Sequence, residues 1–557
     1  PTDNEDDNMA DVLGGSSEPS SKKQKLSGVA GLDAAATAFL RTEALHLAAS
    51  SGVLLGADGP FSHAPLSLLP YPYPKSLFQQ AKALAMPFSL LCDRISRDLD
   101  WLCDTVRSVV KDDEFTRRLL EIAEKIKSEG AVQPLQLGIY RSDYMVHQPS
   151  EEDVPRLMQV ELNTISCSFV TLASKLSGMH RHLVPRAGAA GPAAEALRAQ
   201  PALAAALADP KLELLPHNES LSGIAAAIAQ AHGEYVAAMP GGGGGGGESK
   251  SPVVLMVVQP TERNVIDQRG VDHQLWHAHG VPMVRASLAD LQRTATLSAD
   301  RKALLLTADG GATPTEVSVV YFRAGYTPND YAGEAEWEAR LLLERSLAVK
   351  CPSIGQHLAG TKKVQQVLAD PAQLARFMDA EQAAVLRSSF AGLYGLDEDG
   401  GDAVEAAVAR AIERPEAYVL KPQREGGGNN LYGEELRDAL RTMSRQERAS
   451  YILMQRIVPP THPVPLMRDG ALDGGECIGM ARVAVLAVLV RPSLATTGSS
   501  GCSRRLEAAL GSHEERPSAS DPTERPWPSR QRPPKSTISP RFGHAGASPS
   551  SASTASS

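Results

Sequence analysis

The chain has 557 residues, enough to bury large cores in two or more domains. Its net charge of −9 and aromatic content of 5% argue against a nucleic acid partner, because basic surface and stacking rings are both scarce. No apolar run approaches the ~20 residues needed to span a bilayer; the longest is Val483–Val490, so we expect no membrane partner.

The N-terminal residues 1–28 are rich in Asp, Ser and Lys and are predicted to be disordered. Within them, Lys22–Lys25 is either a localisation signal or a solvated charge run.

The six cysteines are scattered, with no Cys-x-x-Cys pair, which indicates neither a zinc site nor a disulfide framework. We therefore expect a reducing, cytoplasmic location, and the sequence leaves a plastid location open.

Residues 29–251 are predicted to form a largely helical part that also carries metal and substrate residues. Helical periodicity runs from Ala34 to Glu129, and an alanine-rich stretch, Ala187–Ala208, is helical in part. Strands are expected at Leu135–Tyr140 and Leu157–Leu162. Residues 241–247 are seven consecutive glycines, which have no side chains to pack and favour a flexible linker.

Two further parts follow in the chain. Residues 252–360 alternate apolar runs, Val253–Val258 and Val317–Phe322, with helical stretches, which is typical of a parallel α/β subdomain. Residues 361–478 are helix-rich at first. They then contain a short strand at 418–420, a glycine loop, and another strand at Tyr451–Ile457.

The glycine loop is the most informative motif. It reads Lys421-Pro-Gln-Arg-Glu-Gly-Gly-Gly-Asn-Asn430. Glycines let backbone N–H groups approach phosphate oxygens, Lys421 adds a positive charge, and Glu425 can hold Mg²⁺. A glycine-rich surface turn is the alternative, although the flanking charged residues and paired Asn favour phosphate binding.

A second candidate is the strand Leu157-Met-Gln-Val-Glu-Leu-Asn163. Alternation along a strand places Glu161 and Asn163 on one face and Val160 and Leu162 on the other. Two oxygen ligands pointing the same way suit Mg²⁺. On spacing alone, the pattern favours an exposed polar strand face over a metal site.

Together with other segments, the loop resembles the eukaryotic glutathione synthetases from Ala38 to Cys477. The matching segments are Ile139–Met145, Gln159–Phe169, Glu262–Gln268, Val320–Arg323, Trp337–Ser346, Leu358–Gln366, Lys421–Asn430 and Tyr451–Met454. The resemblance implies a mixed α/β fold of ATP-grasp type with an inserted parallel α/β substrate-binding subdomain. It also implies a homodimer.

The resemblance assigns an ATP site and a Mg²⁺ site. The ATP positions are Glu161, Lys362, Lys421, Pro422, Gln423, Arg424, Glu425, Gly426, Gly427, Gly428, Asn429, Asn430, Tyr432 and the hinge Met454, Gln455, Arg456 and Ile457. The Mg²⁺ ligands are Glu161, Asn163 and Glu425. Lys363, next to Lys362, is expected to be solvated.

For the dipeptide γ-glutamylcysteine, the resemblance assigns a further set of positions. These are Arg141, Ile165, Ser166, Cys167, Ser168, Glu262, Arg263, Asn264, Gln268, Arg323, Gly325 and Tyr326. Arginine binds carboxylates through two parallel hydrogen bonds, which suits an anionic dipeptide. The family's Arg-Asp-Gly-Tyr is Arg323-Ala-Gly-Tyr here, with one carboxylate fewer. Cys167 is expected to pack rather than to act as a nucleophile.

The implied reaction is ATP-dependent ligation of glycine to the cysteinyl carboxylate through an acyl phosphate, without a covalent enzyme nucleophile. The alternative is a synthetase-like protein that binds nucleotide and dipeptide without turnover, because the family's C-terminal segments are not found here. After Ile478, Gly479–Arg482 replaces the family's Ser-Glu-Leu-Gly. Residues 479–557 are predicted to be a disordered, low-complexity tail, arising from a shifted reading frame or serving as an Arg-Pro-rich interaction segment.

Overall fold

The computed structural model describes residues 31–57, 59–111, 113–239, 251–300, 302–307, 314–398, 400–423, 430–472, 478–479 and 482–492. For 478–479, 482–487 and 491–492 only the backbone is described. The described residues belong to one unit, 1–495, which contains both helices and β-sheets.

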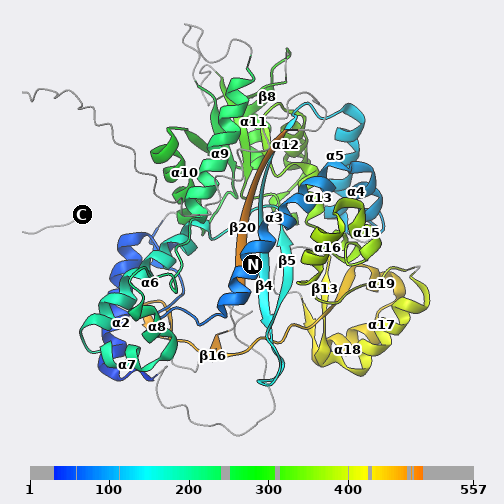
Figure 1. Ribbon diagram of the computed structural model, residues 1–557. Helices are drawn as coiled ribbons and strands as arrows, with labels where there is room; N and C mark the ends of the chain where they lie inside the picture. The colour runs from blue at the N-terminus through cyan, green and yellow to red at the C-terminus, as the bar shows by residue number, and fades with distance from the viewer. Residues whose placement is uncertain are drawn as a thin grey trace, which may run out of the picture. The chain divides into compact units, whose positions relative to one another are not determined.

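The central element for the site is a three-stranded antiparallel sheet in the order β20-β4-β5 (Figure 1). Its strands are β4 (Leu135–His147), β5 (Arg156–Asn163) and β20 (Arg482–Pro492). β4 continues well beyond the predicted Tyr140. β20 pairs with β4 from Arg482 opposite Met145 to Pro492 opposite Leu135, so the prediction of disorder from 479 onwards is wrong for this segment.

Helices cover both faces of this sheet. Leu137 and Ile139 pack with α9 (Ser220–Ala237), whereas Tyr140 and Tyr144 pack with α3 (Lys75–Arg97). The predicted helical stretch after Leu90 is interrupted at Asp98, whose carboxylate caps the next helix by accepting a hydrogen bond from the Trp101 amide at 3.1 Å. The helices that complete this layer are α4 (Leu99–Val106), α5 (Glu114–Glu129), α13 (Ile354–Ala359), α14 (Lys362–Val367), α15 (Pro371–Phe377) and α16 (Ala380–Arg387).

The predicted α/β subdomain contains a six-stranded sheet in the order β7-β6-β10-β9-β8, with β11 also paired to β10. The two apolar runs that predicted it form β6 (Val253–Val257) and β10 (Thr315–Phe322), which run parallel as expected and pair directly with each other. β9 and β8 add antiparallel pairs, so the sheet is mixed. The other elements are α10 (Val265–His279), β7 (Met283–Ala286), α11 (Leu288–Thr294), β8 (Ala295–Leu297), β9 (Leu304–Leu306), η3 (Pro328–Asp330), α12 (Glu334–Arg345) and β11 (Val349–Cys351).

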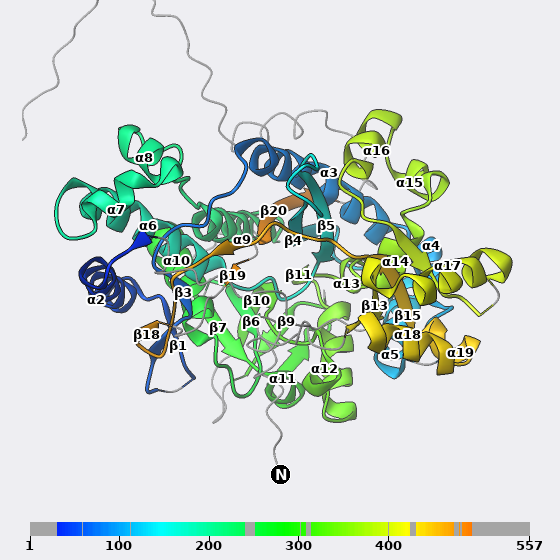
Figure 2. The same cartoon turned by 90° about the horizontal axis from the view of Figure 1, so that it is seen from below.

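The predicted nucleotide strand and hinge strand are neighbours in a four-stranded sheet, β12-β15-β13-β14. α17, α18 and α19 lie beside it (Figure 2), and Leu420, Leu436 and Leu453 share its core with Val408. The elements are β12 (Leu393–Gly395), α17 (Gly401–Glu413), η4 (Pro415–Ala417), β13 (Tyr418–Pro422), β14 (Leu431–Tyr432), α18 (Gly433–Thr442), α19 (Arg445–Ala449) and β15 (Tyr451–Gln455).

A separate core forms around α2 (Ala34–Ser51), where Leu40, Leu183 and Leu197 pack with Met467. The remaining elements are β1 (Leu54–Leu55), β2 (Ser62–His63), β3 (Leu66–Ser67), α6 (Val170–Ala189), α7 (Ala194–Ala199), α8 (Pro201–Ala208), β16 (His462–Pro463), β17 (Leu466–Arg468), β18 (Ala471–Leu472) and β19 (Ile478–Gly479). No described helix is long and apolar enough to cross a membrane.

Candidate active site

The predicted metal strand is β5, and its alternation places the two ligands as expected. In the β4–β5 ladder Asn163 lies opposite Arg141 and Glu161 lies opposite Asp143, so these four side chains share one face. On the other face Val160 and Leu162 line a small internal cavity with Phe88 and Leu91. The third predicted ligand, Glu425, lies outside the described residues, which contain no cluster of three or more Cys, His, Asp or Glu side chains that could hold a metal.

Asp143 was not predicted as a site residue, yet its carboxylate is the centre of this face. Its side chain is 2% exposed and accepts two hydrogen bonds from Arg141, Nε to Oδ1 at 3.0 Å and Nη2 to Oδ2 at 3.1 Å. Asn163 Nδ2 reaches the same Oδ2 at 3.3 Å. A signal was present in the sequence, because Arg141 and Asp143 are two residues apart on a strand.

The second predicted carboxylate-binding arginine, Arg323, is also held by an unpredicted aspartate. Arg323 Nη2 lies 3.0 Å from Oδ2 of Asp267 on α10, and these side chains are 1% and 0% exposed. Arg323 Nη2 also donates to Ser168 Oγ at 3.2 Å. Its Nε and Nη1 groups are buried and have no hydrogen-bond partner among the described residues. Since buried donors are normally satisfied, these N–H groups are suited to an anionic ligand.

The loop after β5 links the metal strand to the α/β subdomain that carries Arg323. Ser166 has a φ of 49° and its hydroxyl donates to the Arg323 carbonyl at 2.8 Å, which ties the end of the metal strand to the α/β subdomain. Ile165 is buried in the core of that subdomain. Cys167 is buried too, and its thiol donates to the Ile139 carbonyl at 3.3 Å, consistent with the packing role expected for it.

Four predicted dipeptide residues lie at the start of α10. Glu262 accepts hydrogen bonds from the Asn264 amide at 2.6 Å and from Gln268 Nε2 at 2.5 Å. Arg285, which was not predicted, donates to the amide oxygen of Gln268, and burial lowers the pKa of its guanidinium. Asn264 Oδ1 is buried and accepts no hydrogen bond from the part of the chain that the structure describes. Arg263 is exposed, and its carbonyl accepts from the Gly56 amide at 2.9 Å.

Gly325 and Tyr326 belong to a turn that is held by the carboxylate of Asp330, a few residues later in the chain. Asp330 accepts hydrogen bonds from the amides of Gly325, Tyr326 and Thr327 at 2.9, 3.0 and 3.1 Å. Gly325 has a φ of +91°, which a residue with a side chain rarely adopts. Although Ala324 stands where the family has an aspartate, the turn that follows it is still held by the three hydrogen bonds to Asp330.

Both predicted nucleotide lysines are buried, and Lys421 contacts the metal strand. Lys421 Nζ donates to the carbonyl of Val160 on β5 at 3.3 Å. Lys362, at the start of α14, is 7% exposed. Gly360, just before α14, packs closely against Thr164, the residue that follows β5. A Cβ at Gly360 would lie 2.3 Å from Thr164 Oγ1, so the absence of a side chain allows this close approach.

One prediction about the lysines is wrong. Lys363 is not solvated: its side chain is 8% exposed and forms an ion pair with Asp397. The carboxylate partner comes from a loop 34 residues later, which local sequence does not reveal.

Other parts of the nucleotide segment are only partly described. Pro422 and Gln423 are buried, and Gln423 Oε1 has no hydrogen-bond partner among the described atoms. Arg424, Glu425, Gly426, Gly427, Gly428 and Asn429 lie outside the described residues. On the far side of this segment, Asn430 Nδ2 donates to Tyr432 Oη at 3.4 Å, and Tyr432 is 47% exposed.

The predicted hinge starts in the last two residues of β15, a central strand of its sheet, and continues past the end of that strand at Gln455. Met454 is buried and packs with Met158 of β5 and Val419 of β13. The amide of Gln455 donates to the Gly392 carbonyl at 2.7 Å. Arg456 is exposed, and Ile457 packs against the same cluster as Met454. The hinge is therefore in contact with both the metal strand and the nucleotide strand.

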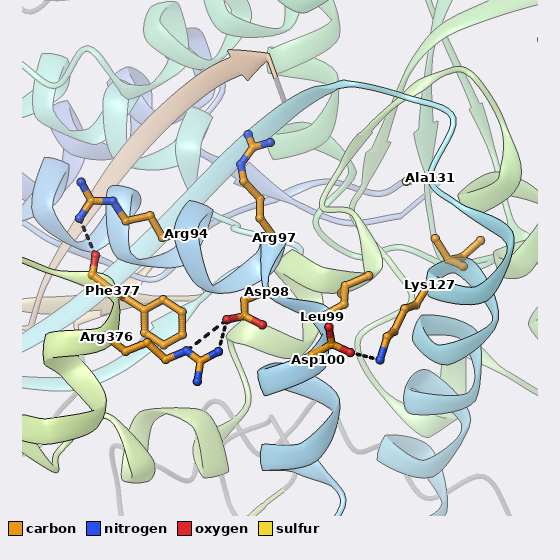
Figure 3. Close-up of a pocket in the computed structure, with 10 residues that line it drawn as sticks. Arg94, Arg97, Asp98, Leu99, Asp100, Lys127, Ala131, Arg376 and Phe377 are labelled. Carbon is orange, nitrogen blue, oxygen red and sulfur yellow. Dashed lines mark hydrogen bonds and ion pairs between the residues drawn. The ribbon is translucent and has the colours of Figure 1, made fainter. Parts of the chain in front are cut away.

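A cleft of about 540 Å³ lies elsewhere, between α3, α4, α5 and α15 (Figure 3). It is lined by Arg94, Arg97, Asp98, Leu99, Asp100, Ile126, Lys127, Ala131, Arg376 and Phe377. Arg376 pairs with Asp98 at 2.7 Å and Lys127 pairs with Asp100, while Arg97 pairs with Asp93 and Arg94 donates to the Phe377 carbonyl at 2.5 Å. Because these cations have protein partners and none of the predicted residues lines the cleft, we assign it no ligand.

Residues 34–486 match the family model for the ATP-binding domain of eukaryotic glutathione synthase. This chain belongs to the eukaryotic glutathione synthetase family. The match continues into β20, beyond Cys477, where the resemblance was expected to stop.

Relatives with the name glutathione synthetase cover most of the chain. The protein from Dictyostelium discoideum is 40% identical over 435 residues, which are 77% of this chain and 83% of that protein. The Homo sapiens protein is 40% identical over 78% of this chain and 84% of its own length. The chloroplastic protein from Solanum lycopersicum is 42% identical over 77% of this chain and 70% of its own length.

A solved structure supports the fold assignment. A glutathione synthetase-like effector from Globodera pallida, in its apo form, superposes with a TM-score of 0.58. The alignment covers 82% of this chain and 96% of the effector at 19% identity. The mixed α/β fold expected from the sequence is therefore confirmed, and the extent of the family match favours a synthetase over a non-catalytic relative.

Proposed function

We propose that this protein is a glutathione synthetase that uses ATP to join glycine to the cysteinyl carboxylate of γ-glutamylcysteine. The observation that carries the proposal is the contact between Lys421 Nζ and the Val160 carbonyl at 3.3 Å. It brings the nucleotide strand against the strand that bears Glu161 and Asn163. Arg141, on the neighbouring strand, shares their face, so groups suited to phosphate, metal and carboxylate lie side by side.

The two arginines account for binding of the acidic dipeptide. Arg141 and Arg323 each use part of the guanidinium on a buried aspartate, which leaves other N–H groups for ligand carboxylates. The carboxylate of Glu262 is suited to an ammonium group of the dipeptide. Such fixed groups would hold the cysteinyl carboxylate in line with the terminal phosphate of ATP.

The reaction that this arrangement supports transfers a phosphoryl group from ATP to the cysteinyl carboxylate and then passes the acyl group to the glycine amine, releasing phosphate. Lys362 and Lys421 would stabilise the negative charge on the transferring phosphoryl group. Exclusion of water is required, because an acyl phosphate hydrolyses.

Mg²⁺ fits the donor chemistry of the site. Glu161 and Asn163 offer oxygen ligands on one strand face, and Glu425 would add a carboxylate from the glycine loop. When bound, Mg²⁺ would neutralise phosphate charge. A cytoplasmic location stays a prediction, since the relatives include a chloroplastic protein. The homodimer that the resemblance implies also stays a prediction.

The test is to measure ADP release and glutathione formation with ATP, Mg²⁺, γ-glutamylcysteine and glycine. We expect Glu425→Ala to reduce both by more than tenfold, because losing one charge-stabilising group costs about 2.7–4 kcal/mol in comparable sites. Glu435→Ala, an exposed residue on α18, is the matched control. A wild-type chain that binds ATP and the dipeptide but forms no glutathione would contradict the proposal and favour the non-catalytic alternative.

A further inference from the structure

Asp143 contacts one residue from each half of the proposed site. Arg141 belongs to the dipeptide set, and Asn163 belongs to the metal set. The Asp143 carboxylate accepts from Arg141 Nε at 3.0 Å and Nη2 at 3.1 Å, and from Asn163 Nδ2 at 3.3 Å. With a side-chain exposure of 2%, Asp143 has little room to leave this position.

The contact with Asn163 determines which end of its amide is presented. Asn163 Nδ2 faces two groups that can only accept, Asp143 Oδ2 at 3.3 Å and the Arg141 carbonyl at 3.4 Å. Only the nitrogen end of an amide can donate, so these acceptors fix its orientation. Oδ1 is thereby turned away from them. That oxygen is the atom an Mg²⁺ ion would require.

The contact with Arg141 determines which edge of its guanidinium is presented. Asp143 occupies the edge formed by Nε and Nη2. The outer edge, with Nη1 and the second Nη2 proton, retains the paired donors that bind a carboxylate. The Arg141 side chain is 18% exposed, so this residue is partly open to a ligand while its inner edge is fixed.

We propose that Asp143 is a positioning residue that orients the dipeptide-binding Arg141 and the metal-binding Asn163 with a single carboxylate. The inference rests on the proposed function, and extends it with a residue that acts through two others. Loss of the carboxylate is expected to weaken dipeptide binding and metal binding together, whereas loss of Arg141 or Asn163 weakens only one of them.

The experiment measures binding in two separate assays without turnover. Calorimetry with γ-glutamylcysteine, in the absence of nucleotide, reports on Arg141. Electron paramagnetic resonance of Mn²⁺, with a non-hydrolysable ATP analogue, reports on Asn163. We expect Asp143→Asn to weaken Mn²⁺ binding about tenfold or more, as is typical when a partner of a metal ligand is lost, and to weaken the dipeptide as well. Arg141→Ala and Asn163→Ala serve as the single-arm controls.

A double substitution makes the test independent of a general loss of stability. If Asp143 acts on the dipeptide through Arg141, then adding Asp143→Asn to Arg141→Ala should weaken dipeptide binding no further. Additive losses in that pair, or an Asp143→Asn variant that affects only one ligand, would overturn the inference. Absence of dipeptide binding by the wild-type chain would instead contradict the proposed function.

Discussion

Asp267 and Arg323 form an ion pair in which neither side chain is more than 1% exposed and the Nη2–Oδ2 distance is 3.0 Å. The same carboxylate accepts hydrogen bonds from the backbone amides of Phe169, Thr171 and Leu172 at 3.0, 2.8 and 3.2 Å. These amides lie at the start of α6. One aspartate therefore fixes both a proposed substrate arginine and the first turn of a helix.

Asp267→Ala should lower the free energy of unfolding by about 3–5 kcal/mol, because it leaves the Arg323 charge buried without its partner. The Michaelis constant for γ-glutamylcysteine should rise as Arg323 loses its fixed position. Urea unfolding and steady-state kinetics measure the two effects. Asp272→Ala, which removes an ion pair with the half-exposed Arg269 on the same helix, is the control. Equal stability of the two variants would contradict this prediction.

Arg141→Ala should raise the Michaelis constant for γ-glutamylcysteine with much less effect on ATP binding, because its proposed ligand is the dipeptide carboxylate. Steady-state kinetics with each substrate varied in turn provides the measurement. Arg41→Ala on α2 is a control, since Arg41 is an exposed arginine. A selective loss of ATP affinity would show that Arg141 has been placed in the wrong half of the site.

Lys350 predicts a pH dependence of stability. Burial lowers the pKa of its ammonium group from 10.5 to about 8, although its Nζ donates to the Ser346 carbonyl at 2.8 Å. Between these two pH values the unfolded chain binds more protons at this residue than the folded chain does. Its contribution to the free energy of unfolding should therefore increase as pH rises from about 8 to 10.5.

The measurement compares wild type with Lys350→Met by urea unfolding across that pH range. The wild-type curve should gain stability relative to the variant as pH rises. Taking the difference between the two removes the contribution of other groups, such as the buried Tyr140, whose pKa is raised by burial. A constant difference would mean that Lys350 does not titrate in this window.

Removing β20 should destabilise the site. A chain that stops after Gly479 lacks the strand that pairs with β4, which would leave a long row of unpaired backbone groups. We expect aggregation and loss of dipeptide binding, measured by size-exclusion chromatography and calorimetry. A chain that stops after Ala495 keeps the strand and is the matched control. If both chains are equally soluble and bind equally, β20 is dispensable.

Local pattern predicted the parts of the site that depend on local geometry. The alternation of β5 placed Glu161 and Asn163 on one face, and the apolar runs of β6 and β10 became parallel neighbours. Asp143 could have been found from its position two residues after Arg141 on a strand, whereas Asp267, which orients Arg323, was missed for a tertiary reason. Asp267 is 56 residues from Arg323 in sequence, and nothing in a helix position reveals such a partner.

The C-terminal strand was missed because composition outweighed a short signal. Val483–Val490 is the longest apolar run, but the Pro-, Ser- and Arg-rich residues that follow it favour disorder for the whole segment. A strand such as β20 is recognised reliably only when the strand that it pairs with is known. That strand is β4, which lies far away in the sequence.

The pairing of β20 with β4 also sets an order of assembly. β4 carries Arg141 and Asp143, yet the strand that covers its second edge is synthesised about 340 residues later. During synthesis, the nascent chain must hold this edge unpaired while the α/β subdomain and the nucleotide sheet emerge. The binding face can therefore mature only after β20 has been synthesised, and before that the unpaired edge of β4 is exposed to aggregation, which chaperones would have to prevent.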